Sequence, residues 1–284
     1  MTTQLLVNTD WLAANLTDPK IRIVDIRGHV APPTDPLPHY FNHVADYAHS
    51  HIPGAVFIDW VHEITDPDDV HHAKIAPPER YQEAMRRHGI DDDTLVVAYD
   101  DAQGMFAARL WFALNYYGHE NVVVLDGGWT QWVLENRPLT AEVPVVEVGR
   151  FVARPRAHWL AFMDEVAQIA ARKQAAKLID VRTLAEFNGA ASRAKRKGHI
   201  PGAINLVRTR FNTPQGTLLP PEQLREVFAQ AGISDSEESV VYCNGGVSAS
   251  YGLLALRRAG FGNTRVYDGS WKEWGNDDDV EIEN

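Results

Sequence analysis

The two halves of the sequence repeat each other, and this repeat constrains the fold more than any other feature. Four short blocks recur in the same order and at similar spacing. They are Ile23–Arg27 with Leu178–Arg182, His51–Ala55 with His199–Ala203, Leu95–Asp100 with Ser239–Cys243, and Leu125–Trp129 with Tyr267–Trp271. The second pair reads His-Ile-Pro-Gly-Ala in both halves, an identity that is hard to obtain by chance. The chain is therefore expected to contain one domain twice.

The length agrees with this expectation, because 284 residues at roughly 150 per domain make about two domains. The segment between the repeats contains Pro138, Pro144 and Pro155, which oppose a continuous helix or a central strand and suit a linker. The predicted division is a first domain over 1–140, a linker over 141–155 and a second domain over 156–284.

Each half alternates short β-branched runs with longer segments of helical period, which is typical of βαβ units with mainly parallel sheets. Val122–Leu125 and Val240–Tyr242 are expected strands. Ala107–Tyr117 and Ser248–Ala259 are the clearest expected helices, and each is closed by a glycine that can take the left-handed position at a helix end. The predicted fold class is α/β, with two domains related by pseudo-twofold symmetry, each a mainly parallel sheet flanked by helices.

Acidic residues outnumber basic ones by 38 to 27, which gives a formal net charge of −11. The resulting field repels phosphate backbones and anionic membrane surfaces, so neither nucleic acid nor a membrane is an expected partner. The first residues do not show the basic and then apolar pattern of a secretory signal, and no apolar run approaches the roughly 18 residues of a membrane span. We expect a cytoplasmic protein in a reducing compartment.

Cys243 is the only cysteine, which excludes an intramolecular disulfide and a four-cysteine metal site. It follows a predicted strand and precedes Gly245, Gly246 and a predicted helix, whereas the first half has Asp100 at the matching position. Such a turn directs backbone N–H groups and the positive helix end towards the side chain in the loop. We therefore expect a lowered thiol pKa and a nucleophilic thiolate beside an anion site. The plainer alternative is that Cys243 packs as a small apolar residue.

Together these segments resemble the tandem-domain rhodanese family, the thiosulfate and 3-mercaptopyruvate sulfurtransferases, from about Ile21 to Trp274. The resemblance rests on both His-Ile-Pro-Gly-Ala blocks, the Asp-Val-Arg before the second one, the loop opened by Cys243 and the Tyr-Asp-Gly-Ser-Trp downstream. It implies two tandem rhodanese-like domains, the first non-catalytic and the second catalytic, with an active site in the cleft between them.

The resemblance also implies the chemistry. Cys243 is expected to take a sulfane sulfur from an anionic donor, to become a persulfide, and to pass the sulfur to cyanide or a thiol. A thioredoxin-like protein or another thiol is a candidate acceptor. The transfer needs a nucleophile and amide donors that hold an anion, so no metal or other cofactor is expected.

Thiosulfate is the favoured donor and 3-mercaptopyruvate the alternative. Thiosulfate enzymes of the animal type carry Arg and Lys immediately after the cysteine, where this chain has Asn244 and Gly245. Mercaptopyruvate enzymes commonly have Gly-Ser-Gly there, so the serine hydroxyl is missing unless Ser248 replaces it. Glu186 stands where the resemblance predicts an arginine. A more distant alternative is a sulfur-carrier or regulatory module, because a fold does not fix a function.

Substrate-binding residues are expected in the cysteine loop and around the cleft. The predicted set is Asn244, Gly245, Gly246, Val247, Ser248, Arg193, Arg196 and His51. Arg193 and Arg196 belong to a basic run that suits an anionic donor, with a solvated loop as the alternative for each residue. The resemblance places His51 in the cleft, although its recurrence as His199 favours a structural role.

Other recurring residues are predicted to be structural, because they are also present in the half without the cysteine. They are Asp25 with Arg27 and Asp180 with Arg182 as ion pairs or turns, His199 and Pro201 as scaffold, and Trp129 with Trp271 in the core. A cluster of histidines fits no zinc pattern and is interpreted as a surface loop rather than a metal site. It comprises His39, His43, His49, His51, His62, His71 and His72.

A phosphatase of the Cys-x5-Arg type is the main enzymatic rival, because such phosphatases resemble this fold and also place a cysteine loop at a helix N-terminus. The arginine position falls on Ala249 in this chain. Without a guanidinium group there, the phosphoryl oxygens and the transition state lack their clamp. We therefore expect no hydrolysis of phosphate esters.

Overall fold

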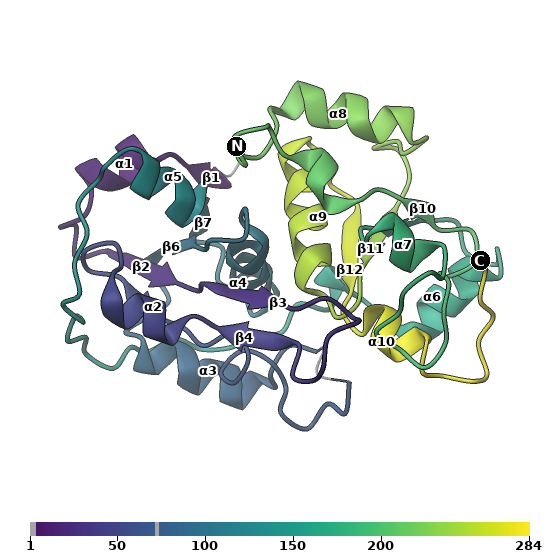
Figure 1. The fold of residues 1–284 in the computed structure, drawn as a ribbon, viewed down its shortest axis with the longest axis horizontal. Coiled ribbons are helices and arrows are strands. Elements are labelled where there is room, and N and C mark those ends of the chain that lie inside the picture. The colour runs from purple at the N-terminus through teal and green to yellow at the C-terminus, as the bar shows by residue number, and fades with distance from the viewer. Residues whose placement is uncertain (1–3, 72–73) are drawn as a thin grey trace.

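The computed structural model describes residues 4–71 and 74–284, and it contains two α/β units side by side (Figure 1). The first unit is built on a five-stranded sheet in the order β1-β7-β6-β2-β5, and all its neighbouring strands pair in parallel. Its strands are β1 (Leu6–Val7), β2 (Ile21–Asp25), β5 (Val56–Phe57), β6 (Leu95–Tyr99) and β7 (Val122–Leu125).

The second unit has a five-stranded parallel sheet in the order β10-β9-β11-β12-β8. Its strands are β8 (Leu160–Ala161), β9 (Lys177–Asp180), β10 (Ile204–Asn205), β11 (Ser239–Tyr242) and β12 (Thr264–Tyr267). Read in the opposite direction, this order matches the first sheet strand for strand, which confirms the α/β fold inferred from the repeat. The central strands β6 and β11 are equivalent, and one ends before Asp100 and the other before Cys243.

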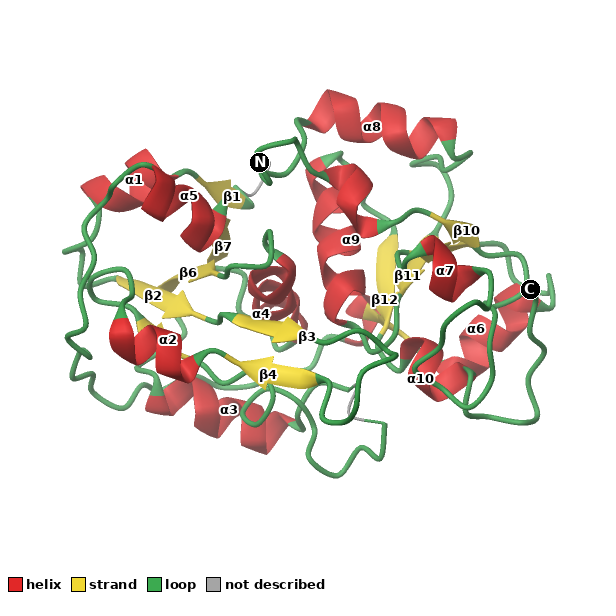
Figure 2. Cartoon of the chain, viewed as in Figure 1, coloured by secondary structure: helices red, strands yellow, loops and turns green. Residues whose placement is uncertain are grey.

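Helices flank both sheets (Figure 2). Those of the first unit are α1 (Thr9–Ala14), α2 (Val44–His49), α3 (Pro78–Arg87), α4 (Met105–Tyr116) and α5 (Gly128–Leu134). Those of the second are α6 (Met163–Ala170), α7 (Leu184–Phe187), α8 (Pro221–Gln230), α9 (Val247–Arg258) and α10 (Ser270–Trp274), with two 3-10 turns, η1 (Ala157–Trp159) and η2 (Arg208–Phe211). Helices α4 and α9 contact each other at the centre of the molecule (Figure 1).

The two helices predicted from periodicity are present as α4 and α9, shifted by one or two residues at their ends. The glycines that close them, Gly118 and Gly260, have φ values of 91° and 92°, which is the left-handed conformation expected of them. Most of α4 is buried, including the apolar Phe106 and Leu110, because the helix packs both on its own sheet and on α9. The two units therefore share one continuous core.

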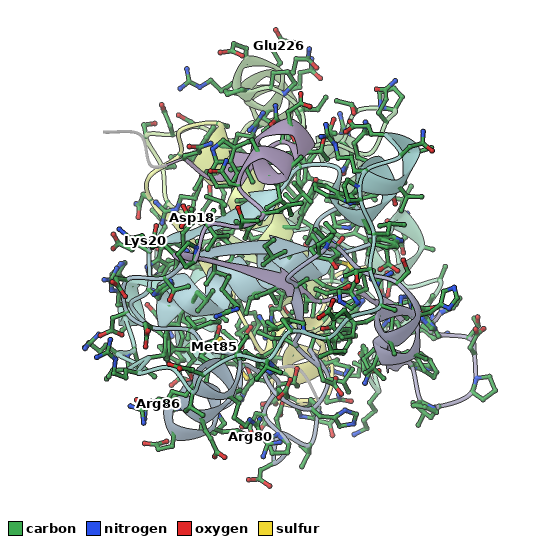
Figure 3. All side chains as sticks on the ribbon, turned by 90° about the vertical axis from the view of Figure 1, so that its left-hand side faces the viewer. Asp18, Lys20, Arg80, Met85, Arg86 and Glu226 are labelled. Atoms are coloured by element: carbon green, nitrogen blue, oxygen red, sulfur yellow. The ribbon has the colours of Figure 1, made fainter. Side chains whose placement is uncertain are left out.

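Helix α3 shows the opposite pattern, since it covers its sheet with one face only. Met85 is fully buried, while Arg80 is exposed. Seen from the end of the first unit, Arg80 and Arg86 lie towards the lower rim of the molecule, and Glu226 of α8 lies at the opposite rim (Figure 3). This alternation of apolar and charged residues is what an outer helix of an α/β sandwich requires.

The first unit contains one element that has no strand counterpart in the described part of the second. This is an antiparallel hairpin of β3 (Gly28–Val30) and β4 (Tyr40–Asn42). It was not predicted from the sequence, because its strands are short and the segment between them is rich in proline. The hairpin reaches towards the second unit (Figure 1), and Arg193 of that unit donates a hydrogen bond to the carbonyl oxygen of Ala31 at 2.6 Å.

The segment predicted as the linker, 141–155, contains no helix or strand. It follows the surface of the first unit: Phe151 is completely buried, and the amide of Arg154 donates to the carbonyl of Tyr117. The domain limits at 140 and 156 stay a proposal. Within the described ranges, no helix combines the length and the apolar character that crossing a membrane would require.

Candidate active site

A cavity of about 470 Å³ lies between the two units and is lined by residues of both. From the second unit it receives Val181, Arg182, Thr183, Glu186, Arg193, Val207, Arg208, Thr209, Cys243, Asn244, Gly245, Val247 and Ser248. From the first unit it receives Gly28, His29, Val30, Tyr40, His43, Trp60, Thr65, Asp101, Ala102 and Met105. The carboxyl ends of β6 and β11 thus face one common space, as is usual for ligand sites at the carboxyl edge of parallel sheets.

Cys243 lies in this cavity and is 4% exposed. The turn after it reaches α9 within a few residues because Gly246 adopts a φ of 75°. The hydroxyl oxygen of Ser270 accepts hydrogen bonds from the amides of Cys243 at 3.1 Å and of Gly246 at 3.2 Å. The amides of Gly245 and Ala249 hydrogen-bond the sulfur. The loop is therefore held from behind by Ser270 while two N–H groups remain directed at the thiol.

The expected lowering of the Cys243 pKa is wrong in its net direction. Burial raises the pKa of the thiol above its ordinary value, and this effect exceeds the opposing effects of the two amides and of Arg109. The two amides lower the pKa, as the sequence predicted. The loss of hydration on burial destabilises the thiolate and raises the pKa by more. A thiol in this position is protonated over most of the neutral range.

An ion pair between the two units lies directly behind the cysteine loop. Arg109 of α4 is buried and bonds the carboxylate of Asp268, which follows β12. Asp268 also accepts a hydrogen bond from the amide of Ile75 at 2.8 Å. A side chain at Gly246 would collide with both partners of the pair, so glycine is needed there for space as well as for its φ. The first unit thus places a cation close to the sulfur.

The loop of the first unit that corresponds to the cysteine loop holds a carboxylate. Asp100 is buried, and its two oxygens accept hydrogen bonds from the amides of Ala102, Gly104, Phe106 and Ala107 at 2.7–2.8 Å. A strand-to-helix loop of this design therefore directs four amide donors at one carboxyl group, and these bonds oppose the burial that raises the pKa of Asp100. The comparison of the halves had identified this position as the place where they differ in chemistry.

The structure brings most of the predicted binding residues to the cavity. These are Asn244, Gly245, Val247, Ser248 and Arg193. Gly246 is buried behind the loop, where its amide is bound to Ser270. Ser248 donates to the sulfur of Met105 at 3.2 Å across the interface.

Two predicted binding residues lie elsewhere, and their assignment is corrected. Arg196 donates hydrogen bonds to the carbonyls of Val280 and Trp274, so it anchors the C-terminal segment. His51 is completely buried outside the cavity, where its Nδ1 bonds the carbonyl of Tyr47 at 2.7 Å. Arg196 was assigned because it belongs to a basic run, and His51 because the family resemblance places it in the cleft, and neither signal reveals which way the side chain points.

The recurring His199 has the same structural role as His51. Its Nδ1 bonds the carbonyl of Phe187 at 2.9 Å, and its ring stacks on that of Phe187. The His51 ring stacks on Tyr47 in the same way. The scaffold interpretation of His199 is therefore confirmed, and His51 has the same structural role in place of the predicted binding role.

The repeated aspartate–arginine pairs are also structural. Asp25 pairs with Arg27 at 2.8 Å and Asp180 with Arg182 at 2.6 Å, and both pairs are buried. Each guanidinium lies over a tryptophan ring, Trp129 in the first unit and Trp271 in the second. Trp271 is fully buried as predicted, whereas Trp129 is partly exposed.

The surface interpretation of the histidine cluster holds only in part. His49 and His62 are exposed, His39, His43 and His71 are half-buried, His51 is in the core, and His72 lies outside the described residues. In the part of the chain that the structure describes, no three His, Cys, Asp or Glu side chains gather where they could hold a metal ion.

Several cavity residues were not predicted. Arg208 of η2 is a second cation beside Arg193, and its Nη1 lies 3.4 Å from the carbonyl of Ala102. Glu186 accepts a hydrogen bond from the side chain of Asn244 at 2.8 Å and thus fixes the residue after the cysteine. His29 and Tyr40 come from the unpredicted hairpin. Arg208 and Arg210 both follow β10, and no local pattern distinguishes the one that lines the cavity from the exposed one.

Comparison with known proteins agrees with this architecture. The model of the family described as Rhodanese-like domain matches residues 8–135 and 163–277. The chain is 34% identical over 285 residues to the sulfur carrier protein TtuD of Thermus thermophilus, covering 96% of this chain and 94% of that protein. It is 32% identical over 286 residues to the 3-mercaptopyruvate sulfurtransferase of Escherichia coli, covering 100% of this chain and 99% of that protein.

A further sequence relative and a solved structure are also similar to this chain. A putative thiosulfate sulfurtransferase of Mycobacterium tuberculosis is 32% identical over 281 residues, covering 95% of this chain and 94% of that one. The crystal structure of SseA from Escherichia coli, a 3-mercaptopyruvate sulfotransferase, superposes with a TM-score of 0.83 at 32% identity. That match covers 95% of this chain and 99% of the other.

Proposed function

The chain belongs to the rhodanese-like domain family, and from this premise we propose that it is a sulfurtransferase that works through a persulfide on Cys243. The observation that carries the proposal is the environment of this thiol. It is the only thiol of the chain, it lies in a cavity between two units, and the amides of Gly245 and Ala249 bond its sulfur. These amides can stabilise first the attacking thiolate and then the persulfide.

The proposed transfer balances without an external oxidant. The Cys243 thiolate attacks the outer sulfur of an anionic donor, and a new S–S bond forms. The bond that held this sulfur in the donor breaks, and the electron pair leaves with the donor remnant, which is sulfite when the donor is thiosulfate. An acceptor nucleophile then removes the outer sulfur and returns Cys243 to the thiolate.

The cations that line the cavity suit an anionic donor. Arg193 and Arg208 approach it from two different segments. The Nη1 of Arg193 is buried and makes no hydrogen bond to any described residue. A buried donor group without an acceptor is costly, and a bound oxyanion would supply one.

Thiosulfate is the first candidate donor, because its outer sulfur can be transferred by a nucleophile and anion-binding groups alone. 3-Mercaptopyruvate is the second candidate, and it is favoured by the full-length similarity to the Escherichia coli enzyme of that name. The hydroxyl of Ser248 also lies at the cavity, although it is engaged by Met105. The two donors share the persulfide and differ in the group that leaves.

A sulfur carrier is a second candidate function, and the similarity to TtuD of Thermus thermophilus favours it. In that case the persulfide on Cys243 would form in the same way, and the acceptor would be a thiol of a partner protein. Phosphate-ester hydrolysis is not proposed, because Ala249 provides only its backbone amide at the sulfur and no guanidinium group.

The division of labour between the units is part of the proposal. The first unit, over 1–140, is proposed to be non-catalytic because Asp100 occupies the position equivalent to Cys243. It would nonetheless complete the site, since Arg109 and the loop at Ala102 contribute to the surroundings of the sulfur.

Intact-mass measurement with both donors tests this function. Incubation with thiosulfate is expected to add about 32 Da, one sulfur atom, and cyanide is expected to remove it. Cys243→Ser should take up no sulfur from either donor while keeping its circular dichroism spectrum. A variant that still transferred sulfur from thiosulfate to cyanide at most of the wild-type rate would refute the proposed nucleophile. An adduct with 3-mercaptopyruvate alone would change the donor assignment.

A further inference from the structure

Three side chains of the first unit form a hydrogen-bonded chain at the cavity. Nδ1 of His43 lies 2.7 Å from Oδ2 of Asp101, and Nε2 of His43 lies 2.8 Å from Nδ1 of His29. Oδ1 of Asp101 accepts a hydrogen bond from the amide of Gly28 at 3.3 Å, which holds the carboxylate at the base of the hairpin. The three residues come from separate segments: β3, the start of α2, and the loop after β6.

The chemistry of the three groups determines which atom donates and which accepts in each hydrogen bond. An ionised carboxylate only accepts, so the proton on His43 is on Nδ1 and points at Asp101. In a neutral imidazole, Nε2 of His43 is then an acceptor, and Nδ1 of His29 donates to it. This leaves Nε2 of His29 with a free lone pair that can take a proton. Nε2 of His29 makes no hydrogen bond within the described ranges of the chain.

All three side chains line the same cavity as Cys243. His29 is exposed to this space, and its ring stacks on Phe41 with centroids 4.5 Å apart, which limits its rotation. Asp101 belongs to a loop of the first unit that also contacts the second unit, since the carbonyl oxygen of Ala102 lies 3.4 Å from Nη1 of Arg208. A proton acceptor oriented by a second and a third group thus faces the space that contains the thiol.

We propose that His29, oriented by His43 and Asp101, takes the proton from a thiol acceptor as that acceptor attacks the persulfide on Cys243. This inference rests on the proposed function and names the acceptor class. The acceptor S–H bond breaks, with its proton going to Nε2 of His29, and the acceptor sulfur bonds to the outer sulfur. The bond between that sulfur and Cys243 breaks, and Cys243 leaves as a thiolate. The proton then passes from His29 to the outer sulfur of the product persulfide.

A thiol acceptor needs such a base, and other partners of the reaction do not. An alkyl thiol is mostly protonated near neutral pH, since the ordinary pKa is about 8.5. Sulfite can attack the persulfide as an anion without losing a proton in the step. His29, oriented by His43 and Asp101, would therefore accept no proton during loading by thiosulfate and would accept one during discharge to a thiol.

Single-turnover discharge tests the inference. The protein is loaded with thiosulfate, freed of excess donor, and mixed at pH 7 with either 2-mercaptoethanol or sulfite. For His29→Gln we expect discharge to 2-mercaptoethanol to be about 100-fold slower than in the wild type, within the range of general base catalysis. Discharge to sulfite should change by less than about 3-fold, because no proton has to be accepted.

The pH profile separates a proton acceptor from a structural residue. The deficit of His29→Gln should shrink towards pH 10, where the thiol ionises by itself. Asp101→Asn, which affects the reaction through His43, should show a smaller deficit of about 10-fold with the same trend. Apart from the substituted residue itself, each variant keeps the ionisable groups that face these three side chains and the cavity: Asp46, Asp101, Tyr40, Glu186, Arg182, Arg193, Arg208 and Cys243.

His62 provides a matched control. Its Nδ1 lies 2.7 Å from Oδ2 of Asp59, so it is another aspartate-bound histidine of the first unit, but it does not line the cavity. His62→Gln should discharge to both acceptors at the wild-type rate. Equal slowing of His29→Gln with sulfite and 2-mercaptoethanol, or no slowing with either, would overturn the inference. Wild-type protein that takes up no sulfur from any donor would instead overturn the proposed function, and the inference with it.

Discussion

Asp100 and Cys243 occupy equivalent positions in the two sheets, each immediately after the central strand. In one unit the loop surrounds a carboxylate with four amides, and in the other it surrounds a thiol with two. The first unit therefore shows that such a loop can direct four amides at one side chain, and the equivalent loop of the second unit holds the thiol. The order of the five sheet strands is the same in the two units, so this contrast in chemistry comes from the loop after the central strand.

The buried carboxylate of Asp100 should be important for stability. Asp100→Ala leaves four buried N–H groups without their acceptor, and we expect the free energy of unfolding to fall by at least about 3 kcal/mol. Urea denaturation followed by circular dichroism measures this change. Asp235→Ala, at an exposed position, serves as the control and should leave the midpoint unchanged. A midpoint for Asp100→Ala equal to that of the control would contradict the assignment of the four bonds.

The rate of sulfur uptake should increase with pH. Burial raises the pKa of Cys243, so the thiolate that attacks the donor forms at a higher pH than for an exposed thiol. We expect the loading rate from thiosulfate to rise between pH 6 and 9 and not to level off in this range, because the pKa of Cys243 lies above that of an exposed thiol. Stopped-flow or quenched mass measurement gives the profile. A rate that is flat from pH 6 to 8 would mean that the thiolate is already present at neutral pH.

The ion pair of Arg109 and Asp268 should join the units energetically. Arg109→Met leaves the Asp268 carboxylate buried and unpaired by a cation, which is expected to cost about 3–5 kcal/mol of unfolding free energy. The double variant Arg109→Met with Asp268→Asn should recover part of this loss, because the charge is removed while Ile75 keeps an acceptor. Additive losses in this double-mutant cycle would show that the two residues do not interact.

Removal of Arg109 should also slow sulfur uptake at neutral pH. Its charge lowers the pKa of Cys243, so the variant should need a higher pH than the wild type for the same loading rate. The pH profile of Arg109→Lys, which retains the charge, should lie closer to that of the wild type.

Arg208 should act on donor binding. Loss of a charge-assisted contact to an anion is worth roughly 1.5–3 kcal/mol, so Arg208→Met should lower kcat/KM for thiosulfate about 10-fold or more. Arg210→Met is the matched control, because Arg210 belongs to the same 3-10 turn, is exposed and does not line the cavity. If the two variants lost activity equally, the cation at 208 would have no specific role.

The sequence was sufficient for the features that depend on local or repeated patterns. The strand Val122–Leu125 was predicted with its observed limits, and the helices α4 and α9 nearly so, because β-branched runs and closing glycines are local signals. The aspartate–arginine pairs could be recognised as structural since they recur in the half without the cysteine. Internal comparison replaced an alignment in these cases.

The sequence was insufficient where an outcome depends on packing between distant segments. The direction of the Cys243 pKa shift is set by burial under residues of both units, which no local pattern reports. Arg193 and Arg196 are three positions apart, yet one side chain lines the cavity and the other holds the C-terminal segment. The same reason explains why His29 and Asp101 were not connected: their contact through His43 exists only after the hairpin has folded onto the loop.

The cavity around the thiol is complete only when both units are present, because residues of both units line it. Its walls are supplied by Ala102 and Met105 on one side and by Val247 and Ser248 on the other. Neither unit alone supplies all the walls that surround the thiol. Duplication has therefore produced one chamber with two halves rather than two independent sites.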